Sequence, residues 1–206
     1  MQENNKPFVL IGVPVLMDCK VNVHTGIFCG RLSLHTNVDF IGKVAHEVSQ
    51  ARNLIIKDFL DDPKYTHLFF LDADTVPPND AIAKLLSHNK DVIAGVTPMF
   101  FNGQKLWSAS MGVDDNVYAY MWIPYHCLPD KLFQPYALGG TTILIKRRVI
   151  EALEWPYFHT ECSPDGRRLG EDVYFTNKIR KAGFQLWCDP SIKCGHFQTR
   201  NLAEIL

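Results

Sequence analysis

The segment 69–75 (FFLDADT) places two carboxylates, Asp72 and Asp74, directly after an apolar run. Side chains two residues apart in an extended chain point the same way, so both carboxylates can face one spot at the end of a strand. Two such oxygen donors suit Mg²⁺ or Mn²⁺, hard cations that bridge phosphates. The alternative is a solvated turn in which one of the two carboxylates caps the next helix.

A second acidic pair, Glu171 and Asp172, begins an expected helix. Acidic residues in a first helical turn are favoured by the helix dipole, so the pair also has an ordinary structural explanation. Asp172 nevertheless shares a helix face with Phe175 and Ile179, which follow it by three and seven residues. If that face is buried, Asp172 points toward a cleft, where a carboxylate can act as a general base.

Three further features could add to such a site. His196 follows Gly195 at the end of the last expected strand, and a neutral imidazole there could bind the same metal. Arg52 lies at the margin of a helix's apolar stripe, either as an ordinary helix-edge residue or as a planar donor fork for a base or phosphate. Gly139 and Gly140 lead into an apolar strand, where they permit a bulge or the close approach of a ligand.

The hydrophobic pattern predicts the elements that position these residues. Strands are expected at 8–15, 66–71 and 91–96, with helices at 42–60 and just after Pro77. This alternation predicts an α/β fold with a mostly parallel sheet, whose carboxyl edge collects ligands. Later expectations are strands at 105–111, 117–123, 136–146, 184–188 and 191–194, helices at 147–153 and 171–182, and a polar loop at 159–170. Because no linker rich in Pro, Gly or Ser interrupts the pattern, we expect a single domain over residues 1–206.

Composition excludes several classes of protein. The chain has 206 residues, 47% of them hydrophobic, and a net charge of −1, so it can bury a core but has no basic excess for a nucleic-acid backbone. The longest apolar run, 8–17, is too short to span a bilayer, and the N-terminus lacks a signal-peptide layout. We therefore expect a cytoplasmic protein whose six cysteines, none in a C-x-x-C pair, are reduced.

In their order along the chain, these features resemble the GT-A class of nucleotide-sugar glycosyltransferases. The likeness is strongest to the small family-two-like enzymes of bacteria and phages, and it extends from about residue 8 to residue 197. The matching segments are VSQARN, FFLDADTVPP, ALGGTTILIKR and GEDVYFTNKIRKAGFQLWCDPSIKCGH. The resemblance implies a Rossmann-like GT-A fold, a Mn²⁺ or Mg²⁺ cofactor and a nucleotide-sugar donor, with UDP expected as the nucleotide.

The resemblance also implies roles for individual residues. These are Pro14 and Val15 beside the nucleotide base, Arg52 and Asn53 at the nucleoside, Asp72 and Ala73 near the ribose and metal, Asp74 and His196 on the metal, Gly139 and Gly140 at the sugar, Asp172 as base with Glu171 beside it, and Arg200 at the diphosphate. The acceptor hydroxyl could belong to a glycan, a protein, a lipid or a modified nucleobase. Direct displacement with one base would invert the anomeric centre. After Pro14, Val15-Leu16-Met17 replaces the small polar turn usual in the family, which leaves the base contacts open.

Two other interpretations remain. The segment 71–76 (LDADTV) also matches the opening motif of haloacid-dehalogenase-like phosphatases, in which Asp72 would be the nucleophile and Asp74 the acid/base. In those enzymes, however, the motif usually follows the first strand, whereas here a strand and a long helix precede it. The other interpretation is a non-catalytic module that binds sugar nucleotides or glycans.

Overall fold

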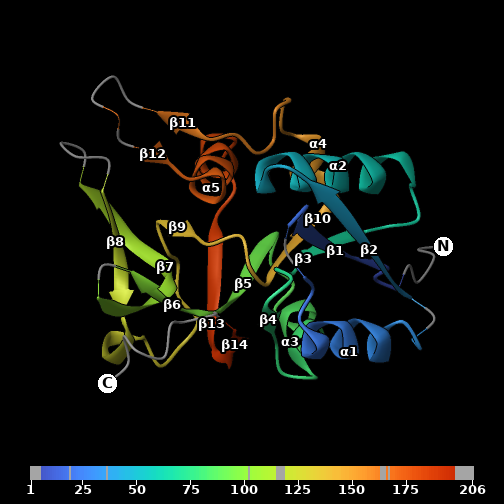
Figure 1. Cartoon of the computed structure of the whole chain (residues 1–206), viewed down its shortest axis with the longest axis horizontal. Helices are drawn as coiled ribbons and strands as arrows, with labels where there is room; N and C mark the ends of the chain where they lie inside the picture. Colours follow the sequence, from blue (N-terminus) through green and yellow to red (C-terminus); the bar gives the residue numbers. More distant parts are fainter. Residues whose placement is uncertain are drawn as a thin grey trace.

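The computed structural model describes residues 6–18, 20–35, 37–101, 103–114, 119–162, 166 and 168–197. Its centre is a six-stranded sheet with the strand order β13-β5-β10-β3-β1-β2 (Figure 1). These strands are β1 (Val9–Leu16), β2 (Val38–Ala45), β3 (His67–Phe70), β5 (Val92–Val96), β10 (Ile143–Lys146) and β13 (Leu186–Lys193). Only β10 runs against its neighbours, and the other adjacent pairs are parallel, so the expectation of a mostly parallel α/β sheet is confirmed.

Helices cover both faces of this sheet (Figure 1). One face carries α2 (Val48–Asp61), α4 (Arg147–Glu151) and α5 (Glu171–Lys181), and the other carries α1 (Val23–Leu32) and α3 (Ala81–Ser87). Successive strand residues point to opposite faces, so Phe70 packs into the core under α2 and α5 whereas Phe69 packs into the core over α1 and α3. The continuously apolar strands of the sequence therefore fill two cores at once.

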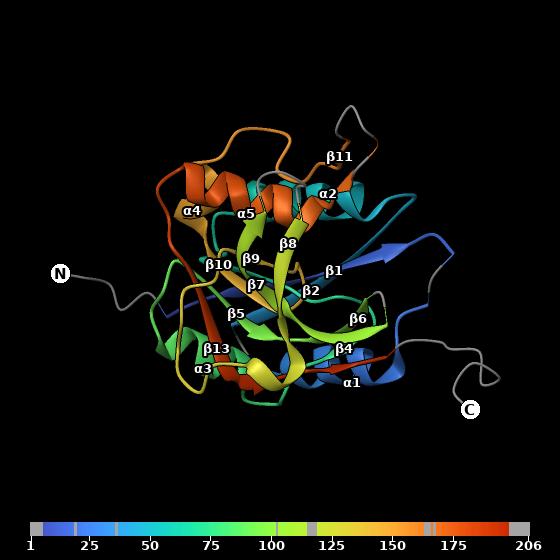
Figure 2. The same ribbon diagram turned by 90° about the vertical axis from the view of Figure 1, so that its left-hand side faces the viewer.

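A second sheet stands beside the first and faces the viewer in Figure 2. It consists of β6 (Pro98–Phe101), β7 (Gln104–Asp114), β8 (Ala119–Pro124) and the short β9 (Ala137–Leu138), and β6, β8 and β9 each pair with β7. A 3₁₀ turn, η1 (Tyr125–Cys127), follows β8, and β11 (Glu161–Cys162) pairs with β12 (Arg168–Leu169) near the start of α5. The second sheet forms a side wall at the carboxyl edge of the central sheet.

A two-stranded ribbon links the end of the described chain to its middle. Strand β4 (Thr75–Val76) pairs with β14 (Gly195–His196) in antiparallel register, with His196 opposite Thr75. The amide of Phe197 donates a hydrogen bond to the carbonyl of Asp74 at 2.9 Å. Two segments far apart in the sequence are thereby fixed side by side at the edge of the sheet.

The expected strands at 8–15, 66–71 and 91–96 are confirmed as β1, β3 and β5, and the expected helix at 171–182 is α5. Gly183 follows α5 with φ 88°, the left-handed conformation that ends many helices. The helix expected over 42–60 is wrong at its start, because residues 42–45 belong to β2 and the helix begins at Val48.

Other boundaries also differ from expectation. Helix α1 was not expected, the two final strands are one continuous β13, and the polar loop contains β11 and β12. In the part of the chain that the structure describes, no helix has the length and apolarity needed to cross a bilayer. The five cysteines within that part are all free thiols.

Candidate active site

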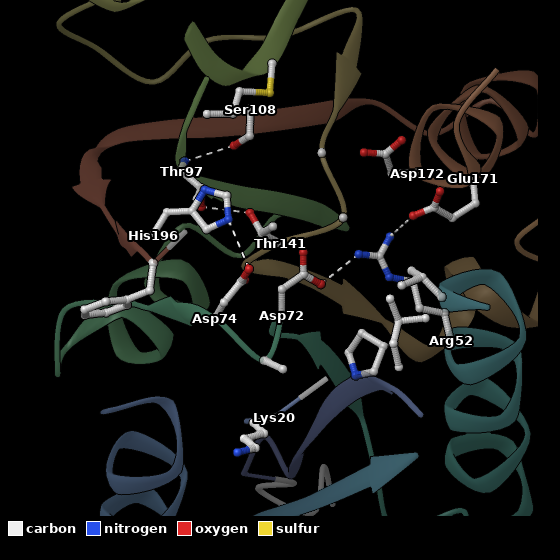
Figure 3. A pocket seen from close by; sticks show the side chains of 18 of the residues that line it. Lys20, Arg52, Asp72, Asp74, Thr97, Ser108, Thr141, Glu171, Asp172 and His196 are labelled. Atoms are coloured by element: carbon white, nitrogen blue, oxygen red, sulfur yellow. Dashed lines mark hydrogen bonds and ion pairs between the residues drawn. The ribbon is translucent and has the colours of Figure 1, made fainter. Parts of the chain in front are cut away.

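A cavity of about 900 Å³ opens where the carboxyl ends of β1 and β3, the start of α5 and the ribbon β4–β14 meet (Figure 3). The second sheet closes one side of it. Its lining is Pro14, Leu16, Asp18, Lys20, Val48, Arg52, Asp72, Ala73, Asp74, Thr97, Met99, Ser108, Trp122, Gly139, Gly140, Thr141, Glu171, Asp172, His196 and Phe197. The structure therefore brings together most of the residues that the sequence singled out.

Asp74 and His196 form a pair on one side of this cavity. His196 Nε2 lies 3.4 Å from Asp74 Oδ2, and His196 Nδ1 lies 2.7 Å from the carbonyl oxygen of Pro98. A carbonyl only accepts hydrogen bonds, so Nδ1 carries a proton and Nε2 is the atom that faces Asp74. Without a metal, the Asp74 carboxylate raises the pKa of His196 above its usual value, because the pair is stable when a proton lies between them.

Arg52 occupies the opposite side of the cavity, where it joins two carboxylates from distant elements. Its Nη2 lies 2.8 Å from Asp72 Oδ1, just after β3, and its Nη1 lies 3.2 Å from Glu171 Oε1, in the first turn of α5 (Figure 3). Only 2% of Arg52 is exposed, which is unusual for a residue at the margin of an apolar stripe. The neighbouring carboxylates hold the pKa of the Arg52 guanidinium above its usual value despite the opposing effect of burial.

Asp172 lies beside this ion-pair network and faces the cavity. Its Oδ1 accepts a 2.7 Å hydrogen bond from the amide of Val173, and no described cation bonds to it directly. Burial and then the adjacent Glu171 raise the pKa of Asp172 to about 6, against the smaller opposing effect of Arg52. A carboxylate with a pKa near neutral is a better proton acceptor than an ordinary aspartate, so Asp172 suits general-base chemistry.

The far wall of the cavity is made of glycine backbone and hydroxyl groups. A Cβ atom at Gly139 would lie 3.0 Å from Ser108 Cβ and 3.7 Å from Asp172 Oδ2, so glycine keeps the space between them open. The Ser108 hydroxyl accepts a bond from the Thr97 amide at 2.9 Å, and the Thr141 hydroxyl donates to Thr97 Oγ1 at 2.8 Å. These side chains present polar atoms to a ligand beside Asp172.

Two residues expected at the nucleoside lie outside this cavity. Val15 is buried in the core against α1 and α3, because strand alternation turns it away while Pro14 and Leu16 face the cavity. Asn53 is also buried, and its side-chain amide bonds both the carbonyl and the amide of Phe158, at 2.8 and 3.0 Å. Arg200 lies outside the described residues.

The cavity also contains residues that the sequence analysis did not single out. Ser108 and Trp122 come from the second sheet, whose place against the strand ends no sequence pattern predicts, and Lys20 follows β1. Side chains alternate between the two faces of β1, so Leu16, and not Val15, lies on the same face as Pro14. This alternation is the sequence signal that identifies Leu16 as a cavity residue. Within the described residues, no three His, Cys, Asp or Glu side chains are arranged as a metal-binding group, so Asp74 and His196 stand as a pair.

No protein-family model matches this chain, and no curated protein sequence matches it. Solved structures do match. The crystal structure of A197 from STIV aligns with a TM-score of 0.63 at 18% identity, over 93% of this chain and 86% of A197.

Two further structures also superpose on nearly the whole chain. GalNAc-T7, crystallised with UDP, GalNAc and Mn²⁺, aligns with a TM-score of 0.58 at 12% identity, over 95% of this chain and 45% of that one. TarS 1–349 of S. aureus, in complex with UDP-GlcNAc, aligns with a TM-score of 0.51 at 13% identity, over 95% of this chain and 60% of that one. The chain thus spans about half the length of these two glycosyltransferases. The GT-A-like fold implied by the sequence resemblance is confirmed.

This fold does not favour the phosphatase interpretation. Asp72 follows the third strand of the chain and not the first.

Proposed function

We propose that this protein is a metal-dependent glycosyltransferase that moves a sugar from a nucleoside diphosphate, UDP, to an acceptor hydroxyl. One observation carries the proposal: a single cavity holds Asp172, whose pKa is raised to about 6, and the Asp74–His196 pair on another side. Metal-dependent sugar transfer with a general base uses a proton acceptor near the attacking hydroxyl and a cation near the departing diphosphate. The UDP and Mn²⁺ in the GalNAc-T7 structure, and the UDP-GlcNAc in that of TarS, support this donor class.

The donor set at Asp74 and His196 fits a divalent metal. It supplies one carboxylate oxygen and one imidazole nitrogen, and the Pro98 carbonyl fixes the tautomer that exposes Nε2, as carbonyls do for many metal-binding histidines. Two protein ligands leave other coordination positions for phosphate oxygens. A metal bound there would neutralise the charge that develops on the departing diphosphate.

The residues of the chain then divide the chemistry. Asp172 accepts the proton of the acceptor hydroxyl, the hydroxyl oxygen bonds to the anomeric carbon, and the bond from that carbon to the phosphate oxygen breaks, releasing UDP. General-base assistance of this kind is typically worth ~10²–10⁴-fold in rate. With one base and direct displacement, the product has the inverted anomeric configuration. Pro14, Leu16 and Val48 supply apolar surface for the uracil ring at the end of β1.

The decisive experiment is a thermal-shift panel of nucleotide sugars with and without Mn²⁺. A ligand at 100 times its dissociation constant should stabilise the folded state by ~2.7 kcal/mol. We expect a metal-dependent shift with a UDP-sugar. The absence of a shift with every nucleotide sugar would refute the proposal, and NMR of the product that showed retained configuration would refute the role of Asp172.

A binding module without catalysis would give the same thermal shifts, so turnover must separate the two. We expect the wild-type protein with Mn²⁺ to hydrolyse the UDP-sugar slowly, water replacing the acceptor. We expect Asp172→Asn to bind UDP normally and to lose this hydrolysis. Equal hydrolysis by the variant would favour the binding module or a different base.

A further inference from the structure

Arg52 is enclosed on several sides, and only 2% of its surface is exposed. The Phe158 ring lies beneath it, with its centroid 5.3 Å from Cζ, and the Phe70 ring lies 6.0 Å away. The backbone of Gly140 covers it from the other side, where a Cβ atom would come within 1.9 Å of Nη1. Asn53, the next residue of α2, holds the Phe158 backbone in place through two hydrogen bonds. This packing restricts the position of the Arg52 guanidinium. The guanidinium in turn restricts the positions of the two carboxylates that it binds.

The two carboxylates that Arg52 binds belong to the two functional sides of the cavity. Asp72 is part of the segment that also bears Asp74, so it lies on the donor and metal side. Glu171 precedes Asp172 in the first turn of α5, so it lies on the side of the proposed base. No described hydrogen bond joins Asp72 to Glu171 directly, and the guanidinium alone spans the gap between them.

Within the described residues, Glu171 and Asp172 make one hydrogen bond to another element, the bond from Arg52 to Glu171, while Val173 and Phe175 pack the helix into the core. The helix begins at Gly170, which offers no side-chain cap, and Asp172 bonds only the adjacent amide of Val173. Three carboxylates (Asp72, Glu171 and Asp172) surround the one guanidinium, so without it they would repel one another and separate. Val173 and Phe175 anchor the helix on the core, and the bond between Glu171 and Arg52 links its first turn to the donor side of the cavity.

We propose that Arg52 is a positioning residue, which ties Asp72 on the donor side to Glu171 on α5 and so holds Asp172 at the distance from the donor that transfer requires. This inference rests on the proposed function. It replaces the expected contact between Arg52 and the nucleoside. Arg52 has no described contact with Asp172 itself, so it acts through Glu171.

The first test separates positioning from donor binding. In Arg52→Met we expect kcat for UDP-sugar hydrolysis to fall by about 100-fold, because small displacements of a reacting group have effects of that size. We expect the Kd of UDP with Mn²⁺, measured by calorimetry, to stay within about threefold of wild type, since only the transition-state geometry is lost. The opposite result, an unchanged kcat with a Kd for UDP that rises as kcat/KM falls, would make Arg52 a nucleoside contact and overturn the inference.

Arg52→Lys keeps the positive charge but cannot bind two carboxylates with one planar fork. We expect Arg52→Met to melt at a lower temperature than wild type, and we expect Arg52→Lys to recover much of that temperature but little of kcat. Full recovery of kcat by lysine would show that charge alone matters and would contradict positioning. Arg148→Met is the matched control, because it removes an arginine–carboxylate pair with Asp91 at the opposite edge of the sheet. It should change neither kcat nor Kd.

A double-mutant cycle tests the link itself. If Arg52 couples the two sides, the effects of Asp72→Asn and Glu171→Gln on kcat should be non-additive in the wild-type background and additive in Arg52→Met or Arg52→Lys. Additive effects in the wild type would overturn the inference while leaving the proposed function intact. If wild-type protein neither binds UDP nor hydrolyses a UDP-sugar, the proposed function fails first and this inference fails with it.

Discussion

His196 Nε2 and Asp74 Oδ2 face each other across 3.4 Å because the ribbon β4–β14 places their backbones side by side. The hydrogen bond between the Phe197 amide and the Asp74 carbonyl closes the same ribbon. Backbone pairing thus places the two side chains next to each other.

We predict that Asp74→Ala and His196→Ala each abolish the Mn²⁺-dependent part of the stabilisation by UDP. The remaining ligand alone binds the metal too weakly, whereas UDP without metal should bind as before. Thermal shifts with UDP, with and without Mn²⁺, test this. His88→Ala is a matched control, since His88 pairs with Asp189 at 2.8 Å outside the cavity and its loss should leave the metal effect unchanged. A full Mn²⁺ effect in either site variant would show that the metal binds elsewhere.

The rate of sugar transfer or donor hydrolysis should rise with pH through a midpoint near 6. The base must be deprotonated to act, and the pKa of Asp172 is raised to about 6 by burial and by Glu171. A profile of kcat from pH 5 to 8 measures this limb. Asp172→Asn should lower kcat by ~10²–10⁴-fold and remove the limb. A flat profile in the wild type would assign the proton transfer to another group.

Asp172→Asn should also make the folded protein more stable at neutral pH. Because the folded-state pKa of Asp172 lies above the unfolded value, the stability that this group contributes is present at low pH and is lost as pH rises through about 6. The loss amounts to at most about 3 kcal/mol at full ionisation, from ~1.4 kcal/mol per pKa unit. Urea denaturation at pH 5 and pH 8 should show the advantage of the variant growing with pH. An advantage that is constant or shrinks would contradict the burial of Asp172.

Asn53→Ala should destabilise the fold without changing the affinity for UDP. Two buried hydrogen bonds to the Phe158 backbone are lost, and unsatisfied buried groups cost roughly 1–3 kcal/mol each. Urea denaturation measures the free energy of unfolding, and calorimetry at a temperature where the variant is folded measures UDP binding. A weaker Kd at unchanged stability would restore the nucleoside role expected from the sequence.

Gly12→Ala should destabilise the packing of α2 on β1. A Cβ atom at Gly12 would lie 2.4 Å from Ile55 Cγ2, and overpacking of this kind costs roughly 1–3 kcal/mol. Gly30→Ala is the control, because nothing lies within 4 Å of its Cβ position and alanine is favoured in a helix by roughly 0.5–1 kcal/mol. In urea denaturation we expect the free energy of unfolding to fall in Gly12→Ala and to rise in Gly30→Ala. An unchanged free energy of unfolding in Gly12→Ala would show that α2 can shift away from β1.

Apolar runs predicted the buried strands well because both faces of β1, β3 and β5 lie in a core. Strand β2 and helix α1 escaped prediction for the opposite reason. Exposed residues such as Phe40 and Val44 interrupt the burial of β2, and α1 leaves Val23 and Ile27 exposed, so neither element shows a clean apolar period. The apolar pattern therefore predicts one helix over 42–60, which includes the end of β2.

In the site, the residues that the structure brings together are those set by strand ends and helix starts, such as Asp72, Asp74 and Asp172. Single steps along an element were harder to predict. Val15 and Asn53 each adjoin a cavity residue, but one step turns a strand residue to the other face and turns a helix residue by about 100°. The burial of Arg52 depends on Phe158 and Gly140, which are distant in sequence, so no local pattern could reveal it.

Because β10 runs antiparallel to its neighbours, it connects the edge of the sheet that bears the cavity to the opposite edge, which bears α4. Its first residues follow the glycine turn at the cavity, while its last residues lead to α4 at the opposite edge, beside the turns at 89–91 and 183–185. None of those turn residues lines the cavity. We expect a fluorophore, affinity tag or fused domain attached at the edge near α4 to leave the cavity open. This edge is therefore a suitable attachment site for immobilisation and for single-molecule work.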